Sequence, residues 1–475
     1  MFLKKDKEFL QKRKRRVIGA HLTSSETFLT HIFPEIKTKL NDYLWVDLYA
    51  GEGNLILPIL KSIPTHKRET FFKKHIFLSD IRKEMVKKSI KKAKSCGISQ
   101  NLAEKHIIER DNLNQFPHFL KKQELPIYHI TNPPYLYLGY IKKHPETKQY
   151  FKYFEGKNNG YQDLYQIAMI NDLRNRIGNL IYIIPTNFLF GSSVSNKFRL
   201  DFLKYYTVEK MYIFEQQMFE FTGTNILIGF FKRKNAPKLN KIVFEGIKFK
   251  NEDTILNRKY NLNPDYKYRA GSEFNEFLDQ FKARKPLKVS YYLQKSEVEK
   301  NKGSYSVNVI DTSEYESNQY NKKIIKVNKS LKEKIFSNRL YIRTVDTGSF
   351  EGRVGLNSIW EDFNVDGIYV SGNTYRTSPI QVFLEPRLSK ENQELLKQYF
   401  DLMLEYFREK LDSEFLTTYK YSKAEYTRKY LGLTQTRSLI KTFPILSIRS
   451  KDLVRFQGLI EEKNPQKIIT LLGEI

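Results

Sequence analysis

Residues 44–54 read LWVDLYAGEGN, an apolar run that ends in an acid and continues into a Gly-x-Gly turn. The aromatic and β-branched side chains at its start favour a strand. Glycines at positions 51 and 53 let the backbone turn sharply and approach a ligand with no Cβ in the way. The third glycine of the dinucleotide fingerprint is missing, which argues against a nicotinamide cofactor. A plain turn that holds no ligand has the same sequence pattern.

Short apolar runs alternate with amphipathic stretches, such as 82–94 and 164–173, over the first 235 residues. This alternation predicts an α/β, Rossmann-like domain with a mostly parallel sheet, in which ligands bind beyond the carboxyl ends of the strands. The short connection 215–225 between the last two strands predicts an antiparallel strand at the sheet edge. The expected strands are Leu44–Leu48, Ile76–Ser79, Ile127–Thr131, Leu180–Ile184, Met211–Phe214 and Ile226–Phe231.

The stretch 232–241, which contains Pro237, predicts a domain boundary after residue 235. Beyond it, residues 236–475 form an irregular pattern of short strands and polar loops, which we interpret as a second, α+β domain. One helix is clear at 389–411, where Ser389 is an N-cap residue and apolar side chains recur with helical spacing.

The charge balance is strongly basic, with 81 Lys and Arg against 53 Asp and Glu and a formal net charge of +28. This favours a polyanionic partner, because lysine and arginine that neutralise phosphates release condensed counterions. A lysine-rich but merely solvated surface is the alternative. The single cysteine, Cys96, excludes a disulfide framework and a cysteine-based zinc site. Histidines 21, 31 and 129 lack the spacing of metal ligands. No apolar run is long enough to span a membrane, so we expect a cytoplasmic location.

Two further acids follow apolar runs. Asp80 ends the run 76–80, where a carboxylate can accept both hydrogen bonds of a ribose diol or can cap the next helix. Asp111 follows Ile107 and Ile108, and it can accept a hydrogen bond from an adenine amino group or be an ordinary solvated loop acid.

Residues 131–135 read TNPPY directly after the strand expected at 127–131. Two successive prolines make a rigid turn with free carbonyl oxygens at the carboxyl end of a strand. The Asn132 side-chain oxygen and the Pro133 carbonyl can both accept from one planar amino group, which would draw the nitrogen lone pair out of conjugation. Tyr135 offers an aromatic face on which a base can stack. An Asn-Pro-Pro turn without function is the less favoured alternative.

An Asp-x-x-x-Gly-x-Gly motif followed 132 − 47 = 85 residues later by Asn-Pro-Pro-Tyr resembles the adenine-N6 DNA methyltransferases of restriction–modification systems. Upstream, residues 19–24 (GAHLTS) resemble the N-terminal motif of that family, although Ser24 stands where the family usually has proline. The motif order, with a long segment after the Asn-Pro-Pro-Tyr loop, resembles the γ group of type II-like modification methylases. The likeness covers about residues 15–235.

The resemblance implies S-adenosylmethionine as the cofactor, with no metal. It assigns residues 1–235 to the catalytic, cofactor-binding domain and residues 236–475 to a target recognition domain. The cofactor residues that it implies are Thr23, Asp47, Tyr49, Ala50, Gly51, Gly53, Asp80, Ile81, Asp111, Asn112 and Asn132. The catalytic residues that it implies are Asn132, Pro133, Pro134 and Tyr135. Tyr135 and Phe219, with Phe221 as a rival to the latter, would stack on the target base.

The implied activity is that of a site-specific DNA-methyltransferase (adenine-specific), which modifies N6 of a flipped adenine in double-stranded DNA. The implied partners are duplex DNA and a cognate restriction endonuclease that acts separately, and we expect a monomer that does not bind a membrane. The DNA-contacting residues expected in the distal half are Arg376, Arg387, Arg428, Lys429 and Arg437. The alternatives are an RNA adenine methyltransferase, a glutamine-side-chain methyltransferase and a DNA-binding specificity module with an inactive methyltransferase fold.

Overall fold

The structure is a computed structural model with two compact units, Met1–Ala270 and Gly271–Ile475, which are described separately below. Among the residues of strands β18 (Thr417–Tyr421) and β19 (Thr427–Tyr430) and the segment between them, the side chains of residues 418–428 are not described. The described backbone covers residues 23–216, 218, 225–250, 254–346, 352–374, 378–421 and 427–475.

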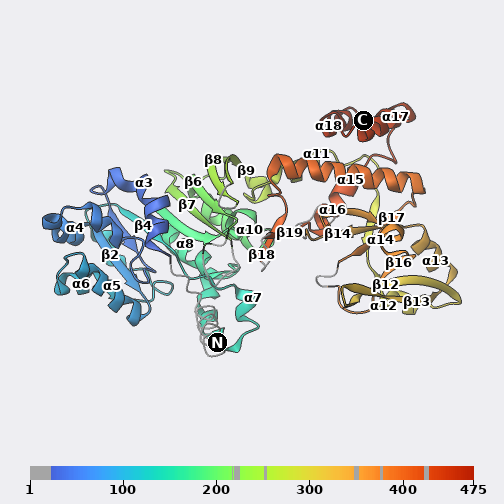
Figure 1. The fold of residues 1–475 in the computed structure, drawn as a ribbon. Helices are drawn as coiled ribbons and strands as arrows, with labels where there is room; N and C mark the ends of the chain where they lie inside the picture. The colour runs from blue at the N-terminus through green and yellow to red at the C-terminus, as the bar shows by residue number, and fades with distance from the viewer. Residues whose placement is uncertain are drawn as a thin grey trace. The chain divides into compact units, whose positions relative to one another are not determined.

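The first unit is built on a nine-stranded sheet, counted over the described residues, with strand order β3-β2-β1-β4-β5-β7-β6-β8-β9. Neighbouring strands from β3 to β5 are parallel, while β7 is antiparallel to both β5 and β6. Helices α4, α5 and α6 pack against β1, β2 and β3 (Figure 1). The chain order reverses direction between β1 and β4, the position at which such sheets bind ligands. The α/β fold with a mostly parallel sheet is therefore confirmed.

The strands of this sheet are β1 (Leu44–Asp47), β2 (Ile76–Asp80), β3 (Ile107–Glu109), β4 (Ile127–Thr131), β5 (Asn179–Pro185), β6 (Tyr206–Phe214), β7 (Ile226–Arg233), β8 (Ile242–Phe249) and β9 (Ile255–Leu262). The helices of the first unit are α2 (Ser25–Thr27), η1 (Phe28–Ile32), α3 (Phe33–Ile36), η2 (Lys37–Lys39), η3 (Leu57–Ser62), η4 (Thr65–Lys67), α4 (Arg68–His75), α5 (Lys83–Ser95), α6 (Gln100–His106), η5 (His118–Lys122), α7 (Leu138–Ile141), η6 (Pro145–Phe154), η7 (Gly156–Asn158), α8 (Leu164–Arg174), α9 (Asn187–Phe190), α10 (Ser193–Leu203) and η8 (Pro264–Tyr266).

The structural division falls after Ala270 and not after residue 235, where the sequence pattern had placed it. Strands β8 and β9 continue the first sheet, because β8 pairs in parallel with β6 and in antiparallel with β9. Alternate residues of β8 are buried, but the buried positions include Gly246 and Lys248, so the sequence of this stretch lacks a clean apolar–polar alternation. The antiparallel strand expected next to the parallel part is present, but the sheet edge is β9.

The second unit contains two four-stranded sheets and one two-stranded sheet among the described residues. Most strand pairs are antiparallel, and helices lie both between the strands and after the last one in the chain, so the α+β class is confirmed. The longest helix, α15 (Lys390–Leu411), starts where predicted, and Ser389 Oγ accepts from Asn392 N at 3.2 Å. The other elements are α11 (Ser272–Gln280), β10 (Lys288–Tyr291), β11 (Leu293–Gln294), α12 (Lys295–Lys300), β12 (Tyr305–Glu316), β13 (Gln319–Val327), α13 (Lys329–Phe336), β14 (Leu340–Arg343), β15 (Gly355–Ser358), α14 (Ile359–Phe363), β16 (Gly367–Val370), β17 (Ile380–Glu385), β18 (Thr417–Tyr421), β19 (Thr427–Tyr430), α16 (Leu433–Ile440), α17 (Ser450–Glu461) and α18 (Pro465–Glu474).

A buried ion pair fastens α15 within the second unit. Arg408 donates from Nη1 and Nη2 to the two carboxylate oxygens of Asp346, at 2.9 and 3.1 Å. Both side chains are buried, and Arg408 also donates to the Val354 carbonyl oxygen. Two parallel bonds fix the orientation as well as the distance of the pair.

In the described part of the chain, no helix is both long and apolar enough to cross a membrane.

Gly53 ends the turn after β1 in a left-handed conformation, with φ of +75°. A Cβ at this position would lie 2.6 Å from Leu57 Cδ1, so both backbone and packing demand glycine. We expect Gly53→Ala to lower the free energy of unfolding by about 2–4 kcal/mol, the sum of left-handed strain and overpacking. Gly97→Ala is the matched control, because Gly97 also has a positive φ but nothing lies within 4 Å of its Cβ position. Equal losses in urea unfolding of the two variants would contradict the packing argument.

Candidate active site

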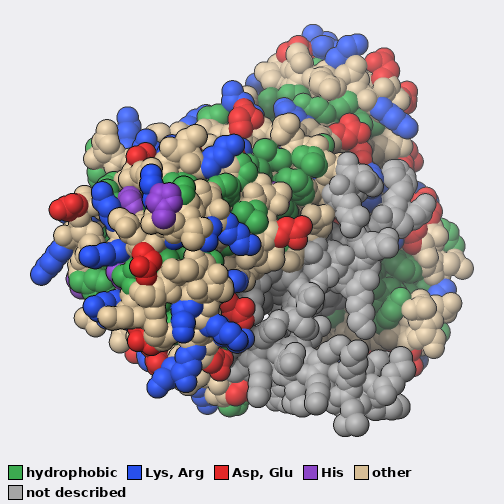
Figure 2. All heavy atoms as spheres, turned by 60° about the vertical axis from the view of Figure 1, so that its left-hand side comes forward, with side chains coloured by type: hydrophobic (Ala, Val, Ile, Leu, Met, Phe, Trp, Pro, Cys, Tyr) green, Lys and Arg blue, Asp and Glu red, His purple; other side chains and the backbone are tan. Residues whose placement is uncertain are grey.

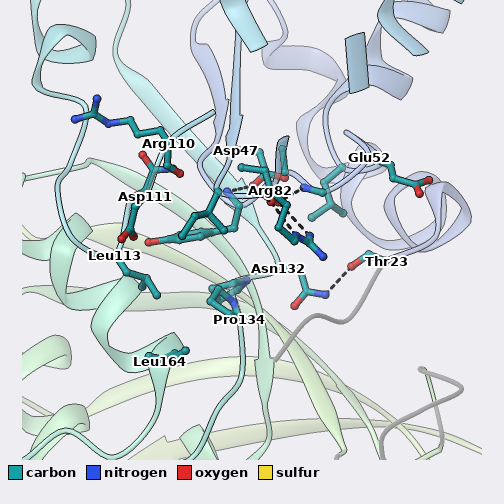
Figure 3. Close-up of a pocket in the computed structure, with 18 of the residues that line it drawn as sticks. Thr23, Asp47, Glu52, Arg82, Arg110, Asp111, Leu113, Asn132, Pro134 and Leu164 are labelled. Atoms are coloured by element: carbon teal, nitrogen blue, oxygen red, sulfur yellow. Dashed lines mark hydrogen bonds and ion pairs between the residues drawn. The ribbon is translucent and has the colours of Figure 1, made fainter. Parts of the chain in front are cut away.

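A cavity opens beyond the carboxyl ends of β1, β2 and β4 (Figure 3). Its volume is about 950 Å³ when the space open to solvent at its mouth is counted, which suits a small-molecule ligand. The expected cofactor and catalytic residues that line it are Thr23, Asp47, Tyr49, Ala50, Gly51, Asp80, Ile81, Asp111, Asn112, Asn132, Pro133 and Pro134. The structure therefore brings together side chains that are far apart in sequence.

Asp47 forms the floor of this cavity and is almost completely buried. Its Oδ1 accepts from Thr131 Oγ1 at 2.6 Å and from Tyr49 N at 3.0 Å. Burial raises the pKa of the Asp47 carboxyl to about 6, although the Thr131 hydroxyl, His129 and the Tyr49 amide favour the charged form. The hydrogen bond to Thr131 joins the end of β1 to the residue before Asn132.

The turn that follows Asp47 is tied down along its backbone. Ala50 N donates to the Ser79 carbonyl at 2.9 Å, and Gly51 N donates to Asp80 Oδ2 at 2.8 Å. Ser89 Oγ, from α5, donates to the Gly51 carbonyl at 2.9 Å. Gly53, expected in the cofactor site, lies behind the lining against Leu57 and Ser89 and shapes the turn.

Asp80 is not free at the end of β2. Arg82 donates to Asp80 Oδ1 from its backbone N at 2.9 Å and from Nε at 3.0 Å, and to Oδ2 from Nη2 at 3.2 Å. Arg82 also lines the cavity, as Figure 3 shows. A ribose diol bound to Asp80 would therefore have to share this carboxylate with Arg82 or displace its guanidinium.

Asp111 and Asn112 line the cavity beyond β3. Asn112 Nδ2 donates to the Leu48 carbonyl at 2.6 Å and to Ser79 Oγ at 2.9 Å. Asn112 Oδ1 is buried and, among the described residues, has no hydrogen-bond partner. Because an unsatisfied buried acceptor is costly, this oxygen indicates a place where a ligand donor can bind.

The Asn132 amide is held from two sides. Its Nδ2 donates to Thr23 Oγ1 at 2.8 Å, and its Oδ1 accepts from the Tyr135 hydroxyl (Figure 3 draws the Thr23 contact). Thr23 is itself fixed, because its carbonyl oxygen accepts from Asn54 Nδ2 at 2.7 Å. In this arrangement the Asn132 amide directs its nitrogen to Thr23 and its oxygen to Tyr135.

Tyr135 does not line the cavity, in contrast to the exposed stacking surface that the sequence predicted. It is 9% exposed, its ring meets Tyr165 edge-on at 6.4 Å, and its hydroxyl also lies 2.5 Å from the Ile183 carbonyl oxygen. A phenol has one hydrogen, so Tyr135 donates to Asn132 or to Ile183 at any one time. In this conformation Tyr135 positions Asn132, and stacking on a base would require its ring to turn.

The segment after the Asn-Pro-Pro-Tyr loop is anchored by Asp163. Asp163 Oδ1 accepts from Leu136 N at 2.9 Å, and residues 137 and 163 form an isolated β-bridge. Burial raises the pKa of Asp163 to about 7, against the backbone N–H groups that favour its charged form. Asp163 therefore fixes where the loop leaves the cavity.

Beneath the site, His129 connects three elements. Its Nε2 accepts from Leu48 N at 3.2 Å, and its Nδ1 lies 2.6 Å from Asp172 Oδ2 on α8. Tyr182 on β5 donates to the same carboxylate oxygen at 2.7 Å. His129 therefore has a structural role, because its ring holds the amide directly after β1.

Sequence reasoning missed nine residues that line the cavity: Glu52, Asn54, Leu55, Arg82, Arg110, Leu113, Tyr150, Tyr153 and Leu164. Most of these residues are next to a motif residue in the chain, so they line the cavity because the motif does. Tyr150 and Tyr153 differ, since they lie on η6, away from every motif that we identified. Their only sequence signal is the aromatic-rich stretch 150–154.

The expected DNA-contacting residues of the second unit are dispersed. Arg387 is exposed and lies 3.8 Å from Glu333, and Arg437 donates to the Val289 carbonyl and lies over the Tyr291 ring. Lys429 is 7% exposed and donates to the Asp412 carbonyl, so it packs inside the unit and is not the exposed contact we predicted. Arg376, the Arg428 side chain and Phe219, with its rival Phe221, lie outside the described residues.

The described residues include no group of three or more His, Cys, Asp and Glu side chains that could hold a metal ion.

A glycine turn between two strand-end acids, at the point where strand order reverses, defines a cavity of the kind that binds nucleotide-like ligands. Residues 18–219 match the family model described as Eco57I restriction-modification methylase. Most of the first unit is therefore similar to restriction–modification methylases. No curated protein matches the chain.

Three solved structures are similar to the chain at low sequence identity. The Type IIL restriction-modification enzyme MmeI in complex with DNA is 12% identical, with a TM-score of 0.47 over 96% of this chain and 80% of that one. The DrdV–DNA complex is 12% identical, with a TM-score of 0.39 over 54% of this chain and 31% of that one. A modification subunit of a putative type I restriction enzyme from Vibrio vulnificus YJ016 is 15% identical, with a TM-score of 0.36 over 68% of this chain. This chain spans 62% of that subunit's length.

The raised pKa of Asp47 predicts a specific pH dependence of stability. A carboxyl whose pKa is about 6 when folded and about 4 when unfolded stabilises the fold at low pH, and this contribution is lost as pH rises through 6. Relative to Asp47→Asn, the wild type should lose about 3 kcal/mol of unfolding free energy between pH 4 and pH 7. Urea unfolding of both proteins across this range measures the difference, and parallel curves would contradict the assignment.

Proposed function

We propose that this chain is a γ-group, site-specific DNA methyltransferase that transfers a methyl group from S-adenosylmethionine to N6 of a flipped adenine in double-stranded DNA. The observation that carries the proposal is that Asn132, Pro133 and Pro134 line the same cavity as the glycine turn and the strand-end acids. The family match over residues 18–219 supports modification of DNA as the reaction class.

The residues of the cavity fit the proposed cofactor. Gly51 and Gly53 have positive φ values of 54° and 75°, so the backbone can approach a ligand closely. The Asp111 carboxylate lines the cavity and offers an acceptor to the amino edge of a purine. Asp80 would hold the ribose and Thr23 the methionine carboxylate. When bound, S-adenosylmethionine supplies an electrophilic methyl group on a sulfonium.

The role of Asn132 follows from its neighbours. Because Nδ2 is committed to Thr23, Oδ1 is presented as the acceptor, and an amide oxygen can accept a second hydrogen bond beside that from Tyr135. Together, Asn132 Oδ1 and the Pro133 carbonyl would accept both hydrogens of one amino group and leave its lone pair as the nucleophile. No basic side chain is required to start the reaction, since a neutral amino nitrogen already carries that pair. After it accepts the methyl group, the nitrogen releases one proton to solvent.

An amino group inside a duplex cannot reach this cavity, so the adenine must leave the base stack. The formal charge of +28 would repay part of the unstacking cost through phosphate contacts. Figure 2 shows Lys and Arg side chains spread over one face of the molecule with Asp and Glu among them. We propose that the second unit, Gly271–Ile475, supplies the target recognition, and that the enzyme acts as a monomer separately from a cognate restriction endonuclease.

Asn132→Ala should lower the rate of methyl transfer at least about 100-fold, the usual effect of losing one preorganised hydrogen-bonding group. Duplex binding should be nearly unchanged, because the target amino group is the one DNA contact that we propose for Asn132. The measurement is tritium transfer from labelled S-adenosylmethionine to duplex DNA, RNA and protein in parallel, followed by identification of the modified base.

The matched control is Asn159→Ala, since Asn159 is exposed and does not line the cavity. Full activity of Asn132→Ala would refute the assigned chemistry. Transfer to RNA alone would favour an RNA adenine methyltransferase, and DNA binding without transfer by the wild type would favour an inactive specificity module.

Thr23→Val and Thr23→Ser test the hydrogen bond that orients Asn132. Valine keeps the shape of the side chain but removes the acceptor, so the Asn132 amide can turn over; serine keeps the hydroxyl. We expect kcat to fall about tenfold in Thr23→Val, as expected for a lost buried hydrogen bond, and to be largely retained in Thr23→Ser. Equal rates for the two variants would show that the hydroxyl does not position Asn132.

A further inference from the structure

Tyr153, on η6, lines the cavity next to Asp111, although no motif pointed to it. Its side chain is 5% exposed, and its hydroxyl donates to Asp111 Oδ2 at 2.7 Å. Burial, followed by the Asp111 hydrogen bond, raises the pKa of Tyr153, so the phenol stays protonated at neutral pH. Two oxygens with unused acceptor capacity, the Tyr153 hydroxyl and the Asp111 carboxylate, therefore lie side by side at the cavity wall.

The Asp111 carboxylate is held between competing groups. Its Oδ1 accepts from Asn114 N at 3.2 Å, while Lys152 Nζ lies 4.0 Å from Oδ2 and 4.9 Å from the centre of the Tyr153 ring. Lys152 is largely exposed, so its contact with the carboxylate is weakened by solvent. The Tyr153 hydroxyl, at 2.7 Å, is the shorter contact to Oδ2.

Tyr153 is itself fixed from behind. Asn158 Nδ2 donates to the Tyr153 carbonyl at 2.7 Å, and Arg174 Nη1, from α8, donates to Asn158 Oδ1 at 2.6 Å. The helix that carries the cavity residue Leu164 thus also holds the backbone of η6 at Tyr153. A side chain supported in this way can present a hydrogen-bonding atom at a defined place.

We propose that Tyr153 and Asp111 together read the exocyclic amino group of the cofactor's purine, which makes Tyr153 a specificity-determining residue. This inference rests on the proposed function. An amino group can donate to both oxygens while the Tyr153–Asp111 hydrogen bond is kept, whereas the carbonyl oxygen of a hypoxanthine ring would face the carboxylate and could pair with Tyr153 only if the phenol gave up its bond to Asp111. Sites built to hydrogen-bond a substrate group reject the analogue that lacks it far more strongly than apolar pockets do.

The chain provides a matched control at Tyr161. Its hydroxyl donates to Asp201 Oδ2 at 2.9 Å, and Lys197 lies 4.5 Å above its ring and 2.5 Å from the same carboxylate. The exposed fraction of Tyr161, 4%, is similar to the 5% of Tyr153, but Tyr161 does not line the cavity. Tyr161→Phe therefore removes the same kind of tyrosine–aspartate–lysine contact without touching the proposed purine edge.

The experiment compares the binding of S-adenosylhomocysteine and S-inosylhomocysteine by isothermal titration calorimetry in the wild type, Tyr153→Phe, Tyr161→Phe and Asp111→Asn. We expect the wild type to prefer the adenosyl ligand and Tyr153→Phe to lose about tenfold of that preference, mainly through weaker adenosyl binding. Asp111→Asn should lower the preference in the same direction, and Tyr161→Phe should keep it. Thermal unfolding of each variant verifies that it is folded.

A purely structural role of Tyr153 would weaken both ligands equally, and an unchanged preference in Tyr153→Phe would overturn the inference while the proposed function stands. A loss of preference in Tyr161→Phe would overturn it as well, because the effect would not be local. Should Tyr153→Phe not fold, an unchanged preference in Asp111→Asn would decide against the inference. If the wild type binds neither ligand, the inference fails together with the proposed function.

Discussion

The hydrogen bond from Thr131 Oγ1 to Asp47 Oδ1 joins the carboxyl ends of β1 and β4, and the candidate site depends on it. Asp47 begins the glycine turn and Thr131 precedes Asn132, so this bond sets the two motifs at a fixed separation. Both groups are buried, where an unmade hydrogen bond is costly and a made one is strong. Burial also raises the pKa of Asp47, so the fold gives up stability in order to keep an acid under the cavity.

Around this bond, the site is assembled from polar groups that hold one another. His129 holds the Leu48 amide, Asn112 holds the Leu48 carbonyl, and Thr23 links the Asn54 side chain to Asn132. Each contact joins segments more than thirty residues apart or brings a loop onto a strand end. The cavity is therefore preorganised by its surroundings, which is what a site needs if its polar groups must act on a ligand without rearrangement.

Much of this arrangement is readable in the sequence. The strands that line the site are short apolar runs with strand propensity, and the residues with chemistry follow them directly, so parallel pairing brings them to one edge. The boundary after residue 235 differs from the structural division because strands β8 and β9 mix apolar with glycine, polar and charged residues without the clean two-residue alternation that predicts a strand. Lys429 failed for a related reason, since the charge of a lysine does not reveal that its stem is buried.

The sequence by itself determined the parallel α/β core and the edge of the sheet at which the glycine turn, the strand-end acids and the Asn-Pro-Pro turn meet, because periodicity and proline and glycine geometry are local properties of the chain. Other predicted lining residues, such as Thr23 and Asn112, came from the resemblance to restriction–modification methylases. Only the tertiary structure decided three contacts. The Arg82 guanidinium donates to the Asp80 carboxylate, the Tyr135 ring lies buried against Tyr165, and η6 brings the Tyr153 hydroxyl to Asp111. These outcomes depend on how side chains from separate segments compete for the same hydrogen-bond partners and space, and no local pattern in the sequence records that competition.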